Sequence, residues 1–83
     1  MSPKFGILSV FDHHIARIKR IVEEEFSGCS VVFDQNAWPF IRFHIQDSQG
    51  AMRSQSYPRY SIAELEKLSD EKLRSAIRKL FSS

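Results

Sequence analysis

Hydrophobic residues recur at helical spacing in the first third of the chain. Successive apolar positions are separated by steps of four, three, four and four residues, which place them on one side of a helix. These positions are Phe11, Ile15, Ile18, Val22 and Phe26. Gly28 follows at a point where helices commonly end, because glycine readily adopts a left-handed conformation. The pattern predicts a helix over residues 10–26.

The next two apolar stretches have the character of β-strands. Residues 29–34 combine β-branched and aromatic residues, which favour a strand over a helix. In residues 39–46 the apolar Ile41, Phe43 and Ile45 alternate with polar residues, so apolar and polar side chains point to opposite sides of a sheet. We therefore predict strands over 29–34 and 39–46.

A third strand is predicted over residues 51–57, although this segment is more polar than the other two. Residues 47–50 have the composition of a turn and end in a glycine. Symmetric pairing about this turn sets Ile45 opposite Met52, and both side chains then face the core. Pro58 cannot donate a hydrogen bond to a neighbouring strand, so the sheet is expected to end there.

Two short helices are predicted at the end of the chain, over residues 62–68 and 70–82. Ser61 and Glu64 have the spacing of a capping box, in which each side chain accepts from the backbone N–H of the other residue. Ser69 is followed by two acidic residues, which is the pattern expected at the start of a further helix.

Together these elements predict a single α+β domain over residues 1–83 with the order α-β-β-β-α-α. The short connections between the strands favour a small antiparallel meander of two or three strands. Each amphipathic helix needs an apolar surface, and the simplest arrangement packs all of them on one face of the sheet. The opposite face of the sheet is then open.

Composition and charge limit the class of protein without identifying it. The chain has 83 residues, including seven Phe, and a formal net charge of +2, which permits an anionic partner but does not require one. Cys29 is the single cysteine, so no internal disulfide can form, and a reducing compartment is favoured. The apolar stretch near the N-terminus is too short and interrupted for a signal peptide or a membrane span. We expect a cytoplasmic protein that does not bind membranes.

The open face of the predicted sheet is the candidate binding surface. Arginines beside aromatic and amide side chains are typical of surfaces that grip phosphates and stack on bases, and Arg and Tyr are also common in protein interfaces. A solvent-facing strand is also polar without any binding role. The residues expected on this face are Phe40, Arg42, His44, Gln46, Arg53, Gln55 and Tyr57.

Trp38 is a further candidate binding residue. Together with Pro39 it lies between the first two predicted strands, and we interpret the pair as a rigid apolar corner over the core. If Trp38 is exposed instead, it becomes a candidate interaction hot spot, because tryptophan carries much of the binding energy at many interfaces.

Charged residues in the second half of the first helix are spaced to pair with one another. Glu23 lies four residues after Lys19 and Glu24 four residues after Arg20, as in surface ion pairs of helices. Consecutive glutamates at a helix C-terminus are mildly unfavourable because of the helix dipole. An interface with a basic partner would explain them, and so would simple solubility.

No motif for catalysis or metal binding is found in the sequence. His13 and His14 are adjacent and point about 100° apart on a helix, so they do not form a metal-binding pair and are expected to be solvated or capping. Cys29 follows a helix C-terminus, which is a poor position for a nucleophile, and is expected to be buried and structural. We expect no cofactor, no metal and no enzymatic activity. A concave pocket with clustered titratable residues would instead favour an enzyme.

The sequence therefore predicts a small non-enzymatic binding module. The leading hypothesis is that the open sheet face or a sheet edge docks a protein partner, including a second copy of the chain. The alternative is single-stranded nucleic-acid binding by the same face.

Overall fold

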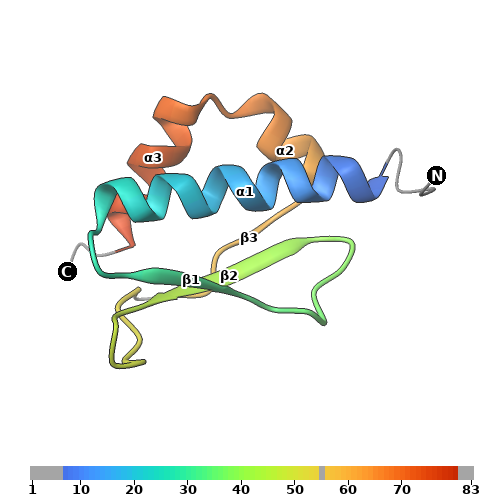
Figure 1. Cartoon of the computed structure of the whole chain (residues 1–83). Helices are drawn as coiled ribbons and strands as arrows, with labels where there is room; N and C mark the ends of the chain where they lie inside the picture. The colour runs from blue at the N-terminus through green and yellow to red at the C-terminus, as the bar shows by residue number, and fades with distance from the viewer. Residues whose placement is uncertain (1–6, 55, 81–83) are drawn as a thin grey trace.

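The computed structural model describes residues 7–54 and 56–80 and has the predicted order of helices and strands. Three helices lie on one side of an antiparallel sheet, and none of the described helices covers its other side (Figure 1). The fold is α+β, as the sequence predicts. Its elements are α1 (Ile7–Glu25), β1 (Ser30–Phe33), β2 (Ile41–Gln46), β3 (Arg59–Tyr60), α2 (Ile62–Lys67) and α3 (Asp70–Lys79).

The sheet has the order β1-β2-β3, so the middle strand of the chain is also the central strand in space. The pairing of β1 with β2 sets Val32 opposite His44 and Phe33 opposite Phe43. On the other side of β2, Ile41 lies opposite Tyr60 and Arg42 opposite Arg59. Because side chains alternate along a strand, this register puts all the arginines of the paired strands on one face.

The predicted third strand over 51–57 is wrong. Among the described residues of this segment, Met52 alone forms a β-bridge, and its partner is Gln46 rather than the predicted Ile45. The paired third strand is Arg59–Tyr60, directly after Pro58, where the sheet was expected to end. Pro58 lacks an N–H, but its carbonyl oxygen accepts from the Phe43 N–H at 3.2 Å, so the proline still contributes to the sheet.

Ser54 explains why the chain leaves the sheet after Met52. Its hydroxyl oxygen is buried and accepts from the Ile45 N–H at 3.0 Å, which is the bond that a third strand would otherwise satisfy. The Ile45 carbonyl oxygen accepts from the N–H groups of both Arg53 and Ser54. A side chain thus replaces backbone pairing at this point, and the predicted turn before it, with Gly50 at a φ of +85°, is confirmed.

The core lies between the sheet and the helices, and all three helices contribute to it. Phe43 is fully buried at the centre of β2, where its ring contacts the rings of Phe33 and Tyr60 at centroid distances of 5.8 and 6.4 Å. The helices cover this layer with aliphatic side chains. The buried core residues are Ile18, Ile21, Val22, Ile41, Phe43, Ile45, Leu65, Leu73 and Ile77.

The glutamates at the end of α1 pair with α3 and not with α1. Arg78 and Arg74 both donate to the Glu25 carboxylate, at 2.6 and 2.8 Å, and Arg74 also donates to Glu24 at 2.8 Å. Hydrogen bonds from Arg78 and Arg74 lower the pKa of Glu25 to about 2. The basic partner that the sequence analysis considered for these glutamates is therefore the last helix of the same chain.

The two C-terminal helices begin at the predicted residues. Ser61 and Glu64 form the capping box, with both reciprocal hydrogen bonds present, and the Ser69 hydroxyl accepts from the Lys72 N–H at 3.2 Å. The predicted extension of the last helix to residue 82 includes residues 81 and 82, which lie outside the described residues. Within the described part of the chain, none of the helices has the length and apolarity needed to cross a bilayer.

Candidate functional site

The open face of the sheet carries the polar half of β2. Ile41, Phe43 and Ile45 are buried against the helices, and the side chains between them point away. Arg42 is exposed, and His44 is half-buried. The predicted alternation of β2 is confirmed, so the open face exists as expected.

Arg42, His44 and Tyr57 come together on this face. The Arg42 guanidinium carbon lies 5.1 Å from the centroid of the Tyr57 ring, and the His44 ring meets the same tyrosine edge-on at 5.1 Å. Arg42 also donates to the Asp34 carboxylate at 3.3 Å. Tyr57 is 45% exposed, so this small cluster is accessible to a ligand.

Arg59 completes the cluster, and the sequence analysis missed it because the third strand was misplaced. Its guanidinium carbon lies 4.8 Å from the centroid of the Phe40 ring, which is 38% exposed. The register sets Arg59 directly opposite Arg42. Because the hydrogen bond to Pro58 comes from the neighbouring Phe43, the two arginines form a non-hydrogen-bonded pair, in which side chains approach most closely.

Like charges directly opposite each other destabilise a sheet, so this arrangement needs a compensating group. The two aromatic rings supply part of it, because a guanidinium over a ring face is attracted by the ring quadrupole. Asp34 supplies a carboxylate to Arg42. In the described residues no carboxylate forms an ion pair with Arg59, whose charge is available to an anion from outside.

On the helical side of the molecule, the arginines have carboxylate partners within the chain. Four arginines there are held by carboxylates of the chain itself, at distances of 2.5 to 2.8 Å. Available guanidinium charge is therefore concentrated on the sheet side, although the net charge of the chain is only +2. The helical arginines are Arg17 and Arg20, which pair with Asp70, and Arg74 and Arg78, which pair with Glu24 and Glu25.

Other predicted site residues are not brought into this cluster. Arg53 is exposed, but its backbone lies opposite Ile45 near the far end of β2 from Arg42. Gln46 also lies at that end and pairs with Ser30 on β1. Gln55 lies outside the described residues.

The interpretation of Trp38 as part of an apolar corner over the core is wrong. Its side chain is 60% exposed, and its ring contacts Phe11 of α1 at a centroid distance of 6.4 Å. Trp38 lines an apolar hollow of about 530 Å³ between α1, α2 and the loop before β2, which we call the Trp38 groove. The groove is lined by Val10, Phe11, Trp38, Pro39, Phe40, Ser61, Ile62 and Glu66.

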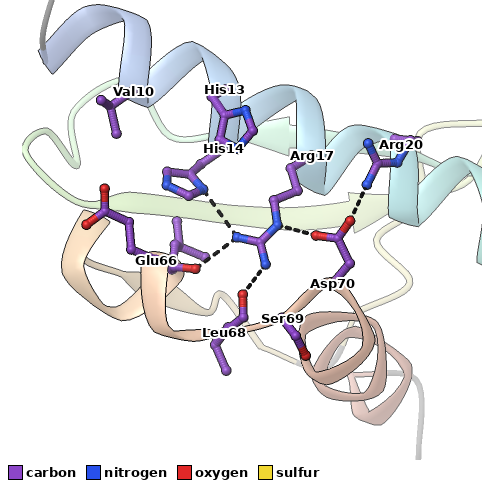
Figure 2. A pocket seen from close by; sticks show the side chains of 10 residues that line it. Val10, His13, His14, Arg17, Arg20, Glu66, Leu68, Ser69 and Asp70 are labelled. Carbon is purple, nitrogen blue, oxygen red and sulfur yellow. Dashed lines mark hydrogen bonds and ion pairs between the residues drawn. The ribbon is translucent and has the colours of Figure 1, made fainter.

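A second hollow, of about 620 Å³, lies between α1 and the junction of α2 with α3, and we call it the Arg17 hollow (Figure 2). Its centre is the buried guanidinium of Arg17. This group donates to the carbonyl oxygens of Leu65 and Leu68 at the end of α2 and to the Asp70 carboxylate at 2.5 Å. One arginine of α1 thereby binds the Leu68 carbonyl just beyond α2 and adds a second donor to the Leu65 carbonyl, which also accepts from the Leu68 N–H at 3.2 Å.

His14 is buried in this hollow, so the prediction of a solvated or capping histidine is wrong for this residue. It is 3% exposed, and its Nδ1 accepts from the Arg17 guanidinium at 3.3 Å. A guanidinium can only donate, so the neutral ring carries its proton on Nε2. Burial lowers the pKa of His14, and the charges of His13 and Arg17 act in the same direction, while Glu66 opposes them.

We expect the free energy of unfolding to fall as the pH drops through the ordinary histidine range. In the unfolded chain the pKa of His14 is near 6.5, whereas in the folded state it is lowered. Below about pH 6.5 the unfolded state therefore binds more protons than the folded state, and the free energy of unfolding decreases. Denaturation curves at about pH 7.5 and about pH 5.5 should show a smaller fall for His14→Gln, whose amide oxygen accepts from Arg17 without titrating. The exposed neighbour supplies the control, because His13→Gln should keep most of the fall. An equal fall in wild type and His14→Gln would contradict this role.

The Arg17 hollow is the kind of concave, titratable pocket that the sequence analysis associated with an enzyme. The charged side chains Arg17, Arg20 and Asp70 of this hollow are already hydrogen-bonded within the chain, however. Arg17 makes three hydrogen bonds to α2 and Asp70, and Asp70 also accepts from Arg20 at 2.6 Å. The Ser69 hydroxyl is used as a helix cap. The arrangement explains the junction of three helices without any substrate.

In the described residues, no group of three or more His, Cys, Asp or Glu side chains is placed to hold a metal ion. Cys29 is half-buried and packs against the core. No protein-family model, curated protein or solved structure matches the chain. We therefore argue function from the chemistry of the open face and the Trp38 groove.

Proposed function

We propose that the protein is a non-enzymatic binding module whose open sheet face docks an acidic segment of a partner protein. The observation that carries the proposal is the placement of Arg42 directly opposite Arg59, each over an exposed aromatic ring. An arrangement that costs stability in the free protein is expected where a ligand supplies the missing charge. A carboxylate between the two guanidinium groups would supply it, because arginine binds carboxylates with paired hydrogen bonds.

The aromatic rings support a protein ligand over a nucleic acid. Base stacking needs open ring faces, and the rings of Tyr57 and Phe40 each carry one of the chain's own guanidinium groups. A nucleic acid also requires several cationic contacts along its backbone. Asp34 already neutralises part of the charge of Arg42, which leaves few cations along this face.

Single-stranded nucleic acid remains the second candidate, because arginines next to exposed Tyr57 and Phe40 are the groups that bind phosphates and bases. A titration with an oligothymidine across a range of salt concentrations decides between the two candidates. Binding of this oligonucleotide that is tighter than binding of an acidic peptide and weakens steeply with salt would replace our proposal.

The direct test uses a fluorescein-labelled peptide of alternating glutamate and serine at low salt. We expect the wild-type protein to bind it and the double variant Arg42→Gln, Arg59→Gln to lose about tenfold or more in affinity, as follows from the loss of two charge-assisted hydrogen-bond partners. Fluorescence anisotropy measures the affinity, and thermal unfolding checks that the variant is folded.

A matched control removes the same charge elsewhere. Lys19 and Lys72 are exposed cations on α1 and α3, and the variant Lys19→Gln, Lys72→Gln should bind the peptide like the wild type, apart from a small effect of net charge. If both double variants lose the same affinity, or if the wild type does not bind the peptide at all, the open face is not the docking surface we propose.

A further inference from the structure

We infer that the Trp38 groove is the second half of the same binding site and takes a large apolar side chain of the acidic segment. This inference rests on the proposed function and names the sequence that the open face recognises. The ligand is an extended peptide in which a glutamate or aspartate lies two positions from a leucine, phenylalanine or similar residue, with one residue between them.

Phe40 joins the two halves of the site. Its ring lies under the Arg59 guanidinium at 4.8 Å, and it also lines the Trp38 groove. A carboxylate on Arg59 and an apolar group in the groove are thus separated by the breadth of one side chain. Residues i and i+2 of an extended peptide lie on one side about 6.6 Å apart, which fits this separation.

The walls of the groove are suited to an apolar side chain and unsuited to a charged one. Phe11, Trp38 and Ile62 line it together with Pro39, and Trp38 is 60% exposed. A tryptophan with this exposure gains contact area when a ligand side chain covers it. Among the described wall residues the acidic one is Glu66 of α2, which disfavours a second carboxylate here.

Charge therefore sets the direction of the ligand. The acidic residue is attracted to Arg59 and Arg42 on the open face, and Glu66 repels it from the far side of the groove. An apolar residue has the opposite preference, since the groove offers aromatic and aliphatic contacts. The same peptide with its acidic and apolar residues far apart would reach only one half of the site.

The experiment compares three labelled peptides by fluorescence anisotropy. The first is the alternating glutamate–serine peptide. The second carries one leucine in place of a central glutamate, so that the nearest glutamates lie two residues away on the same side of the extended peptide. The third carries this leucine with all remaining glutamates changed to glutamine. We expect the leucine peptide to bind the wild type about tenfold tighter than the first peptide, because burying a leucine side chain stabilises a complex by this order. We expect the third peptide to bind far more weakly than the second.

Trp38 provides a second readout, because it is the single tryptophan of the chain. Unlabelled leucine peptide should shift its emission to shorter wavelength, and the glutamate–serine peptide should not. The variant Trp38→Ser should lose the tenfold gain from leucine while it keeps the affinity for the glutamate–serine peptide. The matched control is Met52→Ser, an exposed apolar residue at the other end of the sheet, which should keep the gain.

The outcomes separate this inference from the proposed function. If the glutamate–serine peptide binds but leucine adds no affinity and no emission shift, the groove is not part of the site and the proposed function stands. If the glutamine peptide with leucine binds as tightly as its glutamate counterpart, the groove acts independently of the arginines, and the composite site is wrong. If none of the peptides binds, the proposed function fails together with this inference.

Discussion

Replacement of Arg17 by methionine should lower the free energy of unfolding by about 3 kcal/mol or more, because it removes one partner from a buried polar cluster. The Leu68 carbonyl oxygen loses a donor that is only 8% exposed, and Asp70 loses the hydrogen bond at 2.5 Å; the Leu65 carbonyl oxygen keeps the bond from the Leu68 N–H. Unsatisfied buried acceptors cost about 1–3 kcal/mol each. A domain of 83 residues has roughly 4–12 kcal/mol in total, so this loss is about a quarter to three quarters of the stability of the domain.

Urea denaturation followed by circular dichroism measures the effect, and Arg20 supplies the control. Arg20 also donates to Asp70, at 2.6 Å, but its side chain is exposed, so Arg20→Met should cost less than about 1 kcal/mol. Arg17→Lys keeps the charge but cannot reach two carbonyl oxygens and a carboxylate with one ammonium group, so it should fall between the two. Equal stability of Arg17→Met and Arg20→Met would contradict the structural role of the Arg17 hollow.

The sequence predicts the parts of this fold that depend on local patterns. The apolar stripe of α1, the alternation along β2, the capping box at Ser61 and the N-cap at Ser69 act within a few residues, and the structure has all of them. The position of the third strand depends on a competition at longer range. The Ser54 hydroxyl accepts from the Ile45 N–H of β2 in place of a strand backbone. The local composition does not show which of these two acceptors the N–H binds.

The partners of the charged side chains could not be predicted from local patterns either. The spacing of Lys19 with Glu23 and of Arg20 with Glu24 predicts pairs within α1, whereas Arg20 pairs with Asp70 and Glu24 with Arg74, both in α3. Spacing of i and i+4 brings side chains near each other, but a carboxylate from a neighbouring helix competes for the same guanidinium.

The same limit applies to the candidate site. Arg42, His44 and Tyr57 were predicted to share the open face and do so. Arg42 and His44 are two residues apart on β2, so both side chains point to the same face. Arg59 was missed because its place opposite Arg42 follows from the third strand. Exposure of Trp38 depends on how α1 and α2 meet the loop before β2, which no local pattern specifies.

Replacement of Phe43 by alanine should be about as costly as loss of Arg17, for a different reason. Phe43 is fully buried between the rings of Phe33 and Tyr60, and truncation of a buried phenylalanine costs about 3–5 kcal/mol through lost contacts and the cavity left behind. Thermal and urea unfolding should both show the loss. Val32 on β1 is the matched control, because it is 36% exposed on the opposite face of the same sheet.

We expect Val32→Ala to cost less than about 1 kcal/mol, which is the range of strand preference without burial. The contrast between the two variants tests the direction in which the sheet faces. Phe43 and Val32 belong to adjacent paired strands and point to opposite faces of the sheet; Phe43 is also the larger side chain and lies on the central strand. If both substitutions cost the same, the sheet has no buried and open sides, and Arg42 and Arg59 lose the accessible face on which a ligand would bind.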